Sequence, residues 1–374
     1  MVNSLKVMAL VKVTIIMFQD PSFLHLELKE KHSLSILPNK NWVHLIKRKI
    51  PSFSCPISLQ KEVIGLVRPI SAQISEWRVD HSHIFYLDIF KITNFCWTDS
   101  GTINRLETAK ILVQCPDFTI TQRFALAICY WLVKDMRTLW EAKFTTESHI
   151  PKENSDESLW KGIIHEITTL LEKGIEDYLQ ATFLTKLLLY NSLQNQFQYE
   201  LLEYTQNDLF SKLLTAKEGR DIVIHILKNE WSLYYISVWF SKMGIKRQKI
   251  ILKKAPYGVL KMLLHWPLQI HFMEKVNSIW FRLKKRQFLG LLHIIICQKI
   301  IMEWNDFEYI YVLKEFWNCS PVSFKKYVKQ KNIYRVLKKI LINAHTKPYP
   351  EKYLLHSKNN ISNFTRCSDY TSKL

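Results

Sequence analysis

The stretch WTDSGTINRLETAKILVQCPDFTITQRFALAICYWLVKDMRTLWEAKF, residues 97–144, decides the fold class. We expect a first helix that begins after Ser100, whose hydroxyl can accept a free N–H of the first turn. This helix should end at Pro116, because proline has no N–H to donate and disfavours a helical conformation at Cys115. The apolar side chains between these limits recur at helical rather than strand spacing. They are Ile103, Leu106, Ile111 and Leu112.

A second helix follows, capped by Thr119 or Thr121. Its side chains leave almost no polar face, and such a helix must be covered by neighbours. The apolar set is Phe124, Leu126, Ala127, Ile128, Tyr130, Trp131 and Leu132. A short segment from Asp135 to Trp140 then completes an αα-hairpin with a flanking helix.

The residues before this stretch also have helical periodicity. The expected elements are 1–20, 23–31, 41–49 and 58–67, followed by another helix through Ile74 and Trp77. Pro21 should stop the first of them, and Arg68-Pro69 should separate the last two. The segment 80–97 is rich in β-branched and aromatic residues, so it predicts either a short strand or an irregular connection.

The same helical pattern continues to residue 346. Ser320-Pro321 predicts a helix start, with a capping hydroxyl followed by proline at the first position. We therefore expect an all-α fold of stacked antiparallel helical hairpins. Trp140, Trp280 and Trp317 each end an expected helix, which is compatible with a degenerate helical-repeat array, although no fixed period is legible and an irregular globular helical domain remains an alternative.

Composition shifts predict the domain organisation. Residues 145–158 are polar and contain Pro151, which is typical of a linker or long surface loop. They separate an N-terminal helical region, 1–144, from a C-terminal helical region with basic faces, 159–346. The polar residues 347–374 predict a disordered tail.

Glycine content excludes several classes of enzyme. The 374 residues are 48% hydrophobic but include only 8 glycines, so the chain can bury a large core but has few tight turns. Phosphate-cradling loops need closely spaced glycines to let backbone N–H groups reach the ligand, and no two glycines here are near neighbours. Walker-type and dinucleotide-binding motifs are therefore absent, and no cofactor is expected.

The cysteines and histidines do not form a recognisable metal motif. Seven cysteines are widely spaced, the closest pair being Cys115 and Cys129. This spacing is unlike structural zinc sites and unlike a disulfide framework, so it favours a reducing compartment, either cytoplasm or nucleus. The nearest candidate for a metal site is Asp80, His81, His83 and Asp88. We interpret it as a polar surface loop and expect no metal.

The N-terminal apolar run predicts an amphipathic first helix rather than a signal peptide. Lys12 interrupts the run, and no small-residue cleavage site follows it. The most apolar later window, 288–297, is too short to cross a bilayer, so no transmembrane segment is predicted.

Charge gives the main functional indication. The sequence has 52 Lys and Arg against 33 Asp and Glu, a formal net charge of +19, which favours anionic partners. Two runs contain no acidic residue, from Trp231 to Met273 and from Phe316 to Lys347. The candidate anion- or nucleic-acid-binding residues are Lys246, Arg247, Lys249, Lys253, Lys254, Lys325, Lys326, Lys329, Arg335, Lys338 and Lys339. The alternative is that they are only the solvated outer faces of core helices.

Two segments carry a resemblance. The residues RLETAKILVQCPDFTITQRFALAICYWLVKDMRTLWE and FLGLLHIIICQKIIMEWNDFEYIYVLKEFWNCSP resemble those of an uncharacterised all-helical family with no assigned activity. The resemblance extends over most of residues 1–350. It implies the helical fold again and transfers no catalytic residue, cofactor or partner.

These patterns favour a non-enzymatic helical interaction or scaffold protein that binds another macromolecule, with a protein as the first expectation. RNA or DNA binding through the basic helices is the alternative. An enzyme without a sequence-recognisable motif is the third hypothesis, because catalytic groups meet in space rather than in sequence.

Overall fold

The structure is a computed structural model that describes residues 5–30, 32–49, 56–130 and 243–342, with isolated positions at 132–142 and 224–240. The chain divides into two compact units. Unit 1 consists of residues 1–81, 88–104 and 243–374, and unit 2 of residues 82–87 and 105–242. The expected linker at 145–158, the helices expected between residues 159 and 220, and the tail at 347–374 lie outside the described residues.

The prediction of an all-α fold is confirmed. The described residues form helices, and the β-pairing found among them is a single isolated bridge between Trp97 and Ile103. The finer arrangement, a regular stack of hairpins or a repeat array, stays a prediction.

The first two helices are separated just before Pro21, as the sequence predicts. Helix α1 spans Leu5–Phe18 and α2 spans Pro21–Glu30. Asp20 caps α2 through its side chain, because its Oδ1 accepts a hydrogen bond from the Ser22 N–H at 2.9 Å. Among the described residues, no individual helix has the length and apolar character to cross a membrane, although α1 and α2 taken together, bent by 67°, meet that test by length and composition.

The predicted break at Arg68-Pro69 is wrong. Helix α3 spans Asn39–Lys49, and α4 runs without interruption over Ile57–Phe85 with Pro69 inside it. An internal proline costs a helix about 3 kcal/mol. Residues on both sides of this proline, Val67 before it and Ile70 and Trp77 after it, are fully buried. The tertiary packing of these residues outweighs the lost hydrogen bond.

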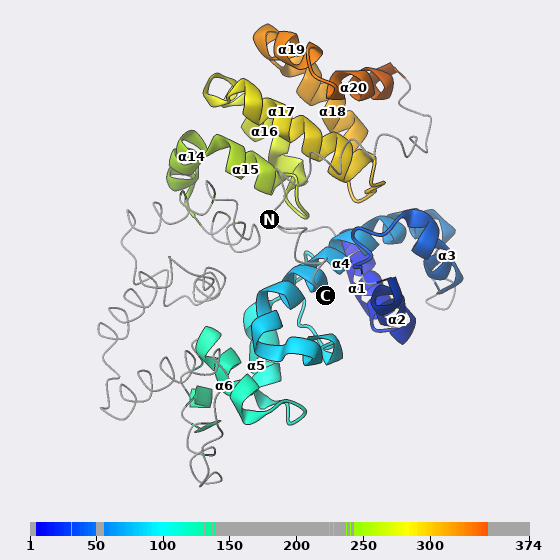
Figure 1. The fold of residues 1–374 in the computed structure, drawn as a ribbon, viewed down its shortest axis with the longest axis vertical. Coiled ribbons are helices and arrows are strands. Elements are labelled where there is room, and N and C mark those ends of the chain that lie inside the picture. Colours follow the sequence, from blue (N-terminus) through cyan, green and yellow to red (C-terminus); the bar gives the residue numbers. More distant parts are fainter. Residues whose placement is uncertain are drawn as a thin grey trace. The chain divides into compact units, whose positions relative to one another are not determined.

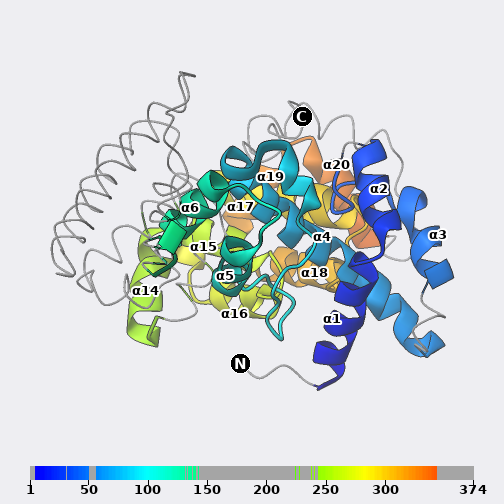
Figure 2. The same cartoon turned by 90° about the horizontal axis from the view of Figure 1, so that it is seen from below.

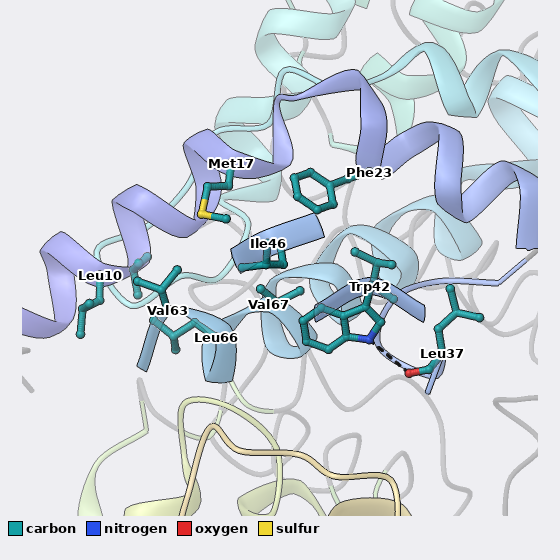
Figure 3. Packing of buried hydrophobic residues seen from close by; sticks show 11 residues of the cluster. Leu10, Met17, Phe23, Leu37, Trp42, Ile46, Val63, Leu66 and Val67 are labelled. Carbon is teal, nitrogen blue, oxygen red and sulfur yellow. Dashed lines mark hydrogen bonds between the residues drawn. The ribbon is translucent and has the colours of Figure 1, made fainter. Parts of the chain in front are cut away.

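The four N-terminal helices enclose a hydrophobic core (Figure 3). Its buried members are Leu10, Val11, Met17, Phe23, Leu34, Leu37, Trp42, Ile46, Val63, Leu66 and Val67. Trp42 also satisfies its indole N–H, which donates to the Leu37 carbonyl at 3.3 Å. Trp266 from the C-terminal part of unit 1 packs against this core, so residues far apart in sequence complete it.

The segment after α4 is irregular, and the alternative of a short strand at 80–97 is wrong. A 3-10 helix, η2, spans Tyr86–Lys91, and the chain then enters a tight turn closed by the Trp97–Ile103 bridge. The predicted capping role of Ser100 is also wrong. Ser100 lies in this turn next to Gly101, whose φ of 77° favours glycine. The Ser100 carbonyl accepts a hydrogen bond from the Trp266 indole N–H at 2.8 Å.

Unit 2 contains the predicted αα-hairpin. Helix α5 spans Arg105–Gln114 and α6 spans Ile120–Cys129, and the two helices contact each other. Thr119, one of the two predicted alternatives, caps α6. Its Oγ1 accepts from the Gln122 N–H at 3.2 Å while the Gln122 Oε1 accepts from the Thr119 N–H at 3.0 Å, which is a complete capping box.

The remaining helices belong to unit 1 (Figures 1 and 2). They are α14 Ile245–Lys254, α15 Pro256–Leu263, η3 Gln269–His271, α16 Phe272–Asn277, η4 Trp280–Arg282, α17 Lys285–His293, the π-helix η5 Ile294–Ile300, α18 Tyr309–Cys319, α19 Val322–Lys329 and α20 Ile333–Ile342. Helix α17 contacts α15 and α19, and α20 contacts both α18 and α19. The expected cap at Ser320 is wrong in detail, because its hydroxyl donates back to the Trp317 carbonyl at 2.7 Å instead of capping α19.

Candidate functional site

Helices α19 and α20 and the turn between them carry six exposed cationic side chains. Each helix buries an apolar stripe, Phe324 and Val328 on α19 and Ile333, Leu337 and Ile340 on α20. This packing leaves the cations exposed. We define the C-terminal basic surface as the exposed residues Lys326, Lys329, Lys331, Arg335, Lys338 and Lys339. The two helices contact each other, and the sequence from Phe316 to Lys347 has no acidic residue.

Neighbouring groups at this surface are engaged within the protein. Lys325, a predicted binding residue, is half-buried, and its Nζ donates to the Asn318 carbonyl at 2.9 Å. The Tyr334 ring packs on Trp317 with the ring centroids 6.1 Å apart. The Lys331 ammonium lies 4.9 Å from the centre of the Tyr327 ring. Tyr327 and Tyr334 are therefore packed against the protein's own side chains.

The other predicted residues form a separate surface on α14. Lys246, Arg247, Lys249, Lys253 and Lys254 are all exposed. Both views of unit 1 show α14 apart from α19 and α20 (Figures 1 and 2). Ten of the eleven predicted cations are thus exposed and lie on two surfaces, one on the single helix α14 and one on the pair α19 and α20, and Lys325 is the exception.

The metal candidate proposed near the end of α4 includes His81, whose surroundings the structure describes. The His81 Nδ1 lies 2.7 Å from the Trp77 carbonyl, and its ring stacks on the Trp77 ring with centroids 4.0 Å apart. The described part of the chain contains no group of three His, Cys, Asp or Glu residues positioned to hold a metal ion. His81 is therefore a packed core residue.

A buried cluster of ionisable residues lies elsewhere in unit 1. Gln269 donates through Nε2 to the Asp306 Oδ2 at 2.7 Å, and the Tyr309 hydroxyl donates to the same oxygen at 3.1 Å. The other carboxyl oxygen, Oδ1, is buried and has no hydrogen-bond partner. Burial raises the pKa of Asp306 above its ordinary value, and burial also raises the pKa of Tyr309.

Lys299 adds an amine to this cluster. It is only 3% exposed and projects from the π-helix η5, a rare element that is frequent at functional sites. Its Nζ lies 3.4 Å from the centre of the Trp304 ring and 5.5 Å from that of Tyr309. Within the described residues it has neither a hydrogen-bond acceptor nor a direct ion pair, so aromatic faces are its main environment.

Burial and charged residues on other elements shift the pKa of the Lys299 amine. Burial lowers the pKa of Lys299 to about 8, and the nearby cation Arg68 adds to the decrease, while Asp306 and Glu76 oppose it. Burial also holds the pKa of the half-buried His265 well below its ordinary value, and Lys299 contributes to that decrease. The cluster thus combines a weakly basic amine, a carboxyl group that is hard to ionise and a neutral imidazole.

We had not predicted this cluster. Lys299 attracts notice in the sequence only as a charge that ends an apolar run, and Gln269, Glu76 and Arg68 are remote from it along the chain.

We predict that Lys299→Met makes unit 1 more stable at pH 7, by about 1–2 kcal/mol. The pKa of Lys299 falls from 10.5 in the unfolded chain to about 8 in the folded chain. Between pH 8 and pH 10.5 the unfolded chain binds more protons at this residue than the folded chain does. The free energy of unfolding of the natural protein therefore rises across this range, by on the order of 3 kcal/mol in total. Loss of the contact with Trp304 offsets part of the gain from removing the buried charge.

Urea unfolding at pH 7 and at pH 10.5 checks this prediction. The advantage of the variant should disappear at the higher pH, where the natural amine is neutral. Lys338→Met, which removes an exposed lysine from α20, is the matched control and should show no such pH-dependent difference. A variant that is less stable than the natural protein at both pH values would contradict the prediction.

Comparison of the chain with protein-family models, with curated proteins and with solved structures gives no match.

Proposed function

We propose that this chain is a non-enzymatic helical interaction protein and that its C-terminal basic surface binds the phosphate backbone of a nucleic acid. The observation that supports the proposal is the placement of five exposed cations on two contacting helices, with a sixth, Lys331, in the turn between them and no acidic residue among them. A surface of one charge sign attracts a polyanion and releases its condensed counterions on binding.

The residue types favour a nucleic acid over the protein partner that the sequence first suggested. Five of the six cations are lysines, and lysine is depleted at protein–protein interfaces, where aromatic residues and arginine are enriched. Phosphate groups, in contrast, are routinely bound by lysine as a point charge. The surface therefore has the composition of a polyanion-binding site.

We propose binding without sequence preference. Sequence-specific readout needs side chains that reach base edges or rings that are available for stacking. Tyr327 and Tyr334 are in contact with Lys331 and Trp317, respectively, and the residues of the C-terminal basic surface are all cations. Backbone contacts are the interaction that such a surface can make. The cysteine pattern adds the proposal of a reducing compartment, cytoplasmic or nuclear.

Retention on double-stranded DNA immobilised on a column tests the proposal. The variant Lys326→Gln, Lys329→Gln, Arg335→Gln, Lys338→Gln should elute at markedly lower salt than the natural protein. The matched control removes four cations from α14, as Lys246→Gln, Arg247→Gln, Lys249→Gln, Lys253→Gln, and should elute near the natural position. Equal losses for both variants would show an effect of net charge alone and contradict the proposed surface.

A protein partner is the second candidate, and exposed aromatic side chains favour it. Phe281 on η4 is 78% exposed and Tyr311 on α18 is 65% exposed, and aromatic residues are typical anchors of protein interfaces. A parallel column of immobilised polyglutamate separates the two candidates. Retention there with none on DNA at low salt would end the nucleic-acid proposal and leave an acidic protein as the partner.

A further inference from the structure

A further group of cations lies where η4 leads into α17, outside the C-terminal basic surface. Residues 281–286 read FRLKKR, and we call them the Phe281 segment. Four of its six residues are exposed cations, Arg282, Lys284, Lys285 and Arg286. None of the four forms an ion pair with another described residue. The sequence from 275 to 302 also contains no acidic residue, so this part of the chain carries positive charge only.

Apolar contacts on both sides hold the Phe281 segment in place. The Trp280 ring stacks on the Phe316 ring with the centroids 5.4 Å apart, and Leu283 is only 5% exposed. The first turn of α17 is also fixed, because the Gln287 Oε1 accepts a hydrogen bond from the Lys284 N–H at 3.0 Å. The two residues between Trp280 and Leu283 are therefore anchored at both ends while their side chains are exposed.

These two exposed residues are an aromatic ring and a planar cation. Phe281 is 78% exposed, although Ile279 and Leu283 on either side of it are almost fully buried. The Arg282 guanidinium carbon lies 4.9 Å from the centre of the Phe281 ring. Aromatic rings and guanidinium planes are the groups on which proteins stack unpaired nucleobases.

We propose that the Phe281 segment binds single-stranded nucleic acid, with a base stacked on the Phe281 ring and the adjacent phosphates bound by the four cations. The inference rests on the proposed function, because it names the strand form of the same polyanionic partner. Inside a duplex the faces of the bases are covered by their neighbours, so a protein ring stacks on bases that are unpaired. Stacking tolerates every base, which agrees with binding without sequence preference.

The Phe281 segment lies beside α19, which carries two cations of the C-terminal basic surface (Figures 1 and 2). The Phe324 ring of α19 packs against Trp280 and Phe288, with centroid distances of 6.3 and 5.3 Å. Lys326 and Lys329 are exposed on the same helix. A helix with its side chains is about 10–12 Å wide, so a strand of a few nucleotides can contact both groups of cations.

The combination of groups favours a nucleic acid over a protein partner. Charged residues are depleted at the centres of protein interfaces, whereas the Phe281 ring is followed by four cations within five residues. A nucleic-acid strand, in contrast, carries a phosphate next to every base. One partner of this kind therefore supplies both the flat ring for Phe281 and the anions for its neighbours.

Fluorescence anisotropy on the full chain tests the inference, with a labelled oligo-dT and a labelled duplex of the same length. Phe281→Ala leaves the net charge unchanged and should weaken oligo-dT binding about tenfold, in the range measured for loss of one stacked base. Duplex binding should change by less than about twofold. Phe281→Trp keeps a stacking ring and should bind oligo-dT at least as tightly as the natural protein. The matched control is Tyr311→Ala, which removes an exposed aromatic side chain from α18 and should change neither affinity.

The outcomes separate this inference from the proposed function. If duplex binding is retained but oligo-dT does not bind, or binds Phe281→Ala as tightly as the natural protein, the inference is overturned and the proposed function stands. Equal losses for oligo-dT and duplex also overturn it, because they show no role for an unpaired base. If Phe281→Ala instead lowers retention on polyglutamate, the segment contacts an acidic protein and the inference is wrong. No binding of either DNA at low salt contradicts the proposed function and this inference together.

Discussion

Arg68→Met is expected to lower the free energy of unfolding of unit 1 by about 3 kcal/mol. Arg68 is 2% exposed and clamps the connection between α2 and α3. It donates to the carbonyls of Ser35 and Leu37 and to the Asn39 Oδ1, at distances from 2.6 to 3.3 Å. Methionine fills similar space but donates nothing, so these buried acceptors lose their charged donor.

Two opposing effects set the size of this loss. Burial lowers the pKa of Arg68 to about 10, which corresponds to a cost on the order of 3 kcal/mol for keeping the charge inside the protein. Each hydrogen bond from a charged group contributes about 1.5–3 kcal/mol, and Arg68 makes four of them. The hydrogen bonds therefore outweigh the desolvation, and their removal destabilises the protein.

Guanidinium unfolding followed by tryptophan fluorescence measures the effect of Arg68→Met. Arg48→Met is the matched control, because Arg48 is exposed on α3, and it should change stability by no more than about 0.5 kcal/mol. A loss below 1 kcal/mol for Arg68→Met would contradict the conclusion that the hydrogen bonds of Arg68 stabilise unit 1.

Gly65→Ala is expected to cost about 2 kcal/mol, although alanine is the better helix former by about 1 kcal/mol. A Cβ at position 65 of α4 would lie 2.6 Å from the Asn305 carbonyl oxygen and 3.1 Å from its carbon. Both atoms are backbone, so the clash is relieved only if the turn after η5 shifts. That turn is held by Asn39, whose Nδ2 donates to the Glu303 carbonyl at 3.4 Å.

The control for this substitution is Gly244→Ala, where an added Cβ meets no atom within 4 Å. Thermal unfolding followed by circular dichroism should show a clear decrease in Tm for Gly65→Ala and a small change for Gly244→Ala. A Tm of Gly65→Ala at or above that of the natural protein would contradict the close approach of α4 to Asn305.

Local sequence signals predicted helices well where the controlling residues are neighbours in sequence. Pro21 separates α1 from α2, and Thr119, in a capping box with Gln122, starts α6. Each of these signals acts over four residues or fewer along the chain, so the sequence displays both partners together.

The failures share a different cause. Pro69 was expected to end a helix, but burial of residues on both sides of it against distant elements keeps α4 continuous. Ser100 resembled a helix cap, but a turn held by Trp266 occupies its position. Tertiary contacts of this kind join residues that are far apart in sequence, and no local pattern records them.

The candidate sites show the same contrast. Exposed cations on α14, α19 and α20 could be predicted from charge and helical period. The cluster of Lys299, Asp306 and Gln269 could not, because its members come from η5, the following turn and η3 and are united only by folding. A charged residue inside an apolar run was the single sign of it.

The salt dependence of DNA binding tests the central claim most directly. Fluorescence anisotropy with a labelled duplex gives the slope of log K against log salt, which changes by about 0.9 for each phosphate neutralised. With six cations on the C-terminal basic surface we expect a slope between about −3 and −5 for the natural protein. The variant lacking Lys326, Lys329, Arg335 and Lys338 keeps two of the six cations and should have a slope of about −1 to −2. No binding at low salt, or the same slope for both proteins, would contradict the account.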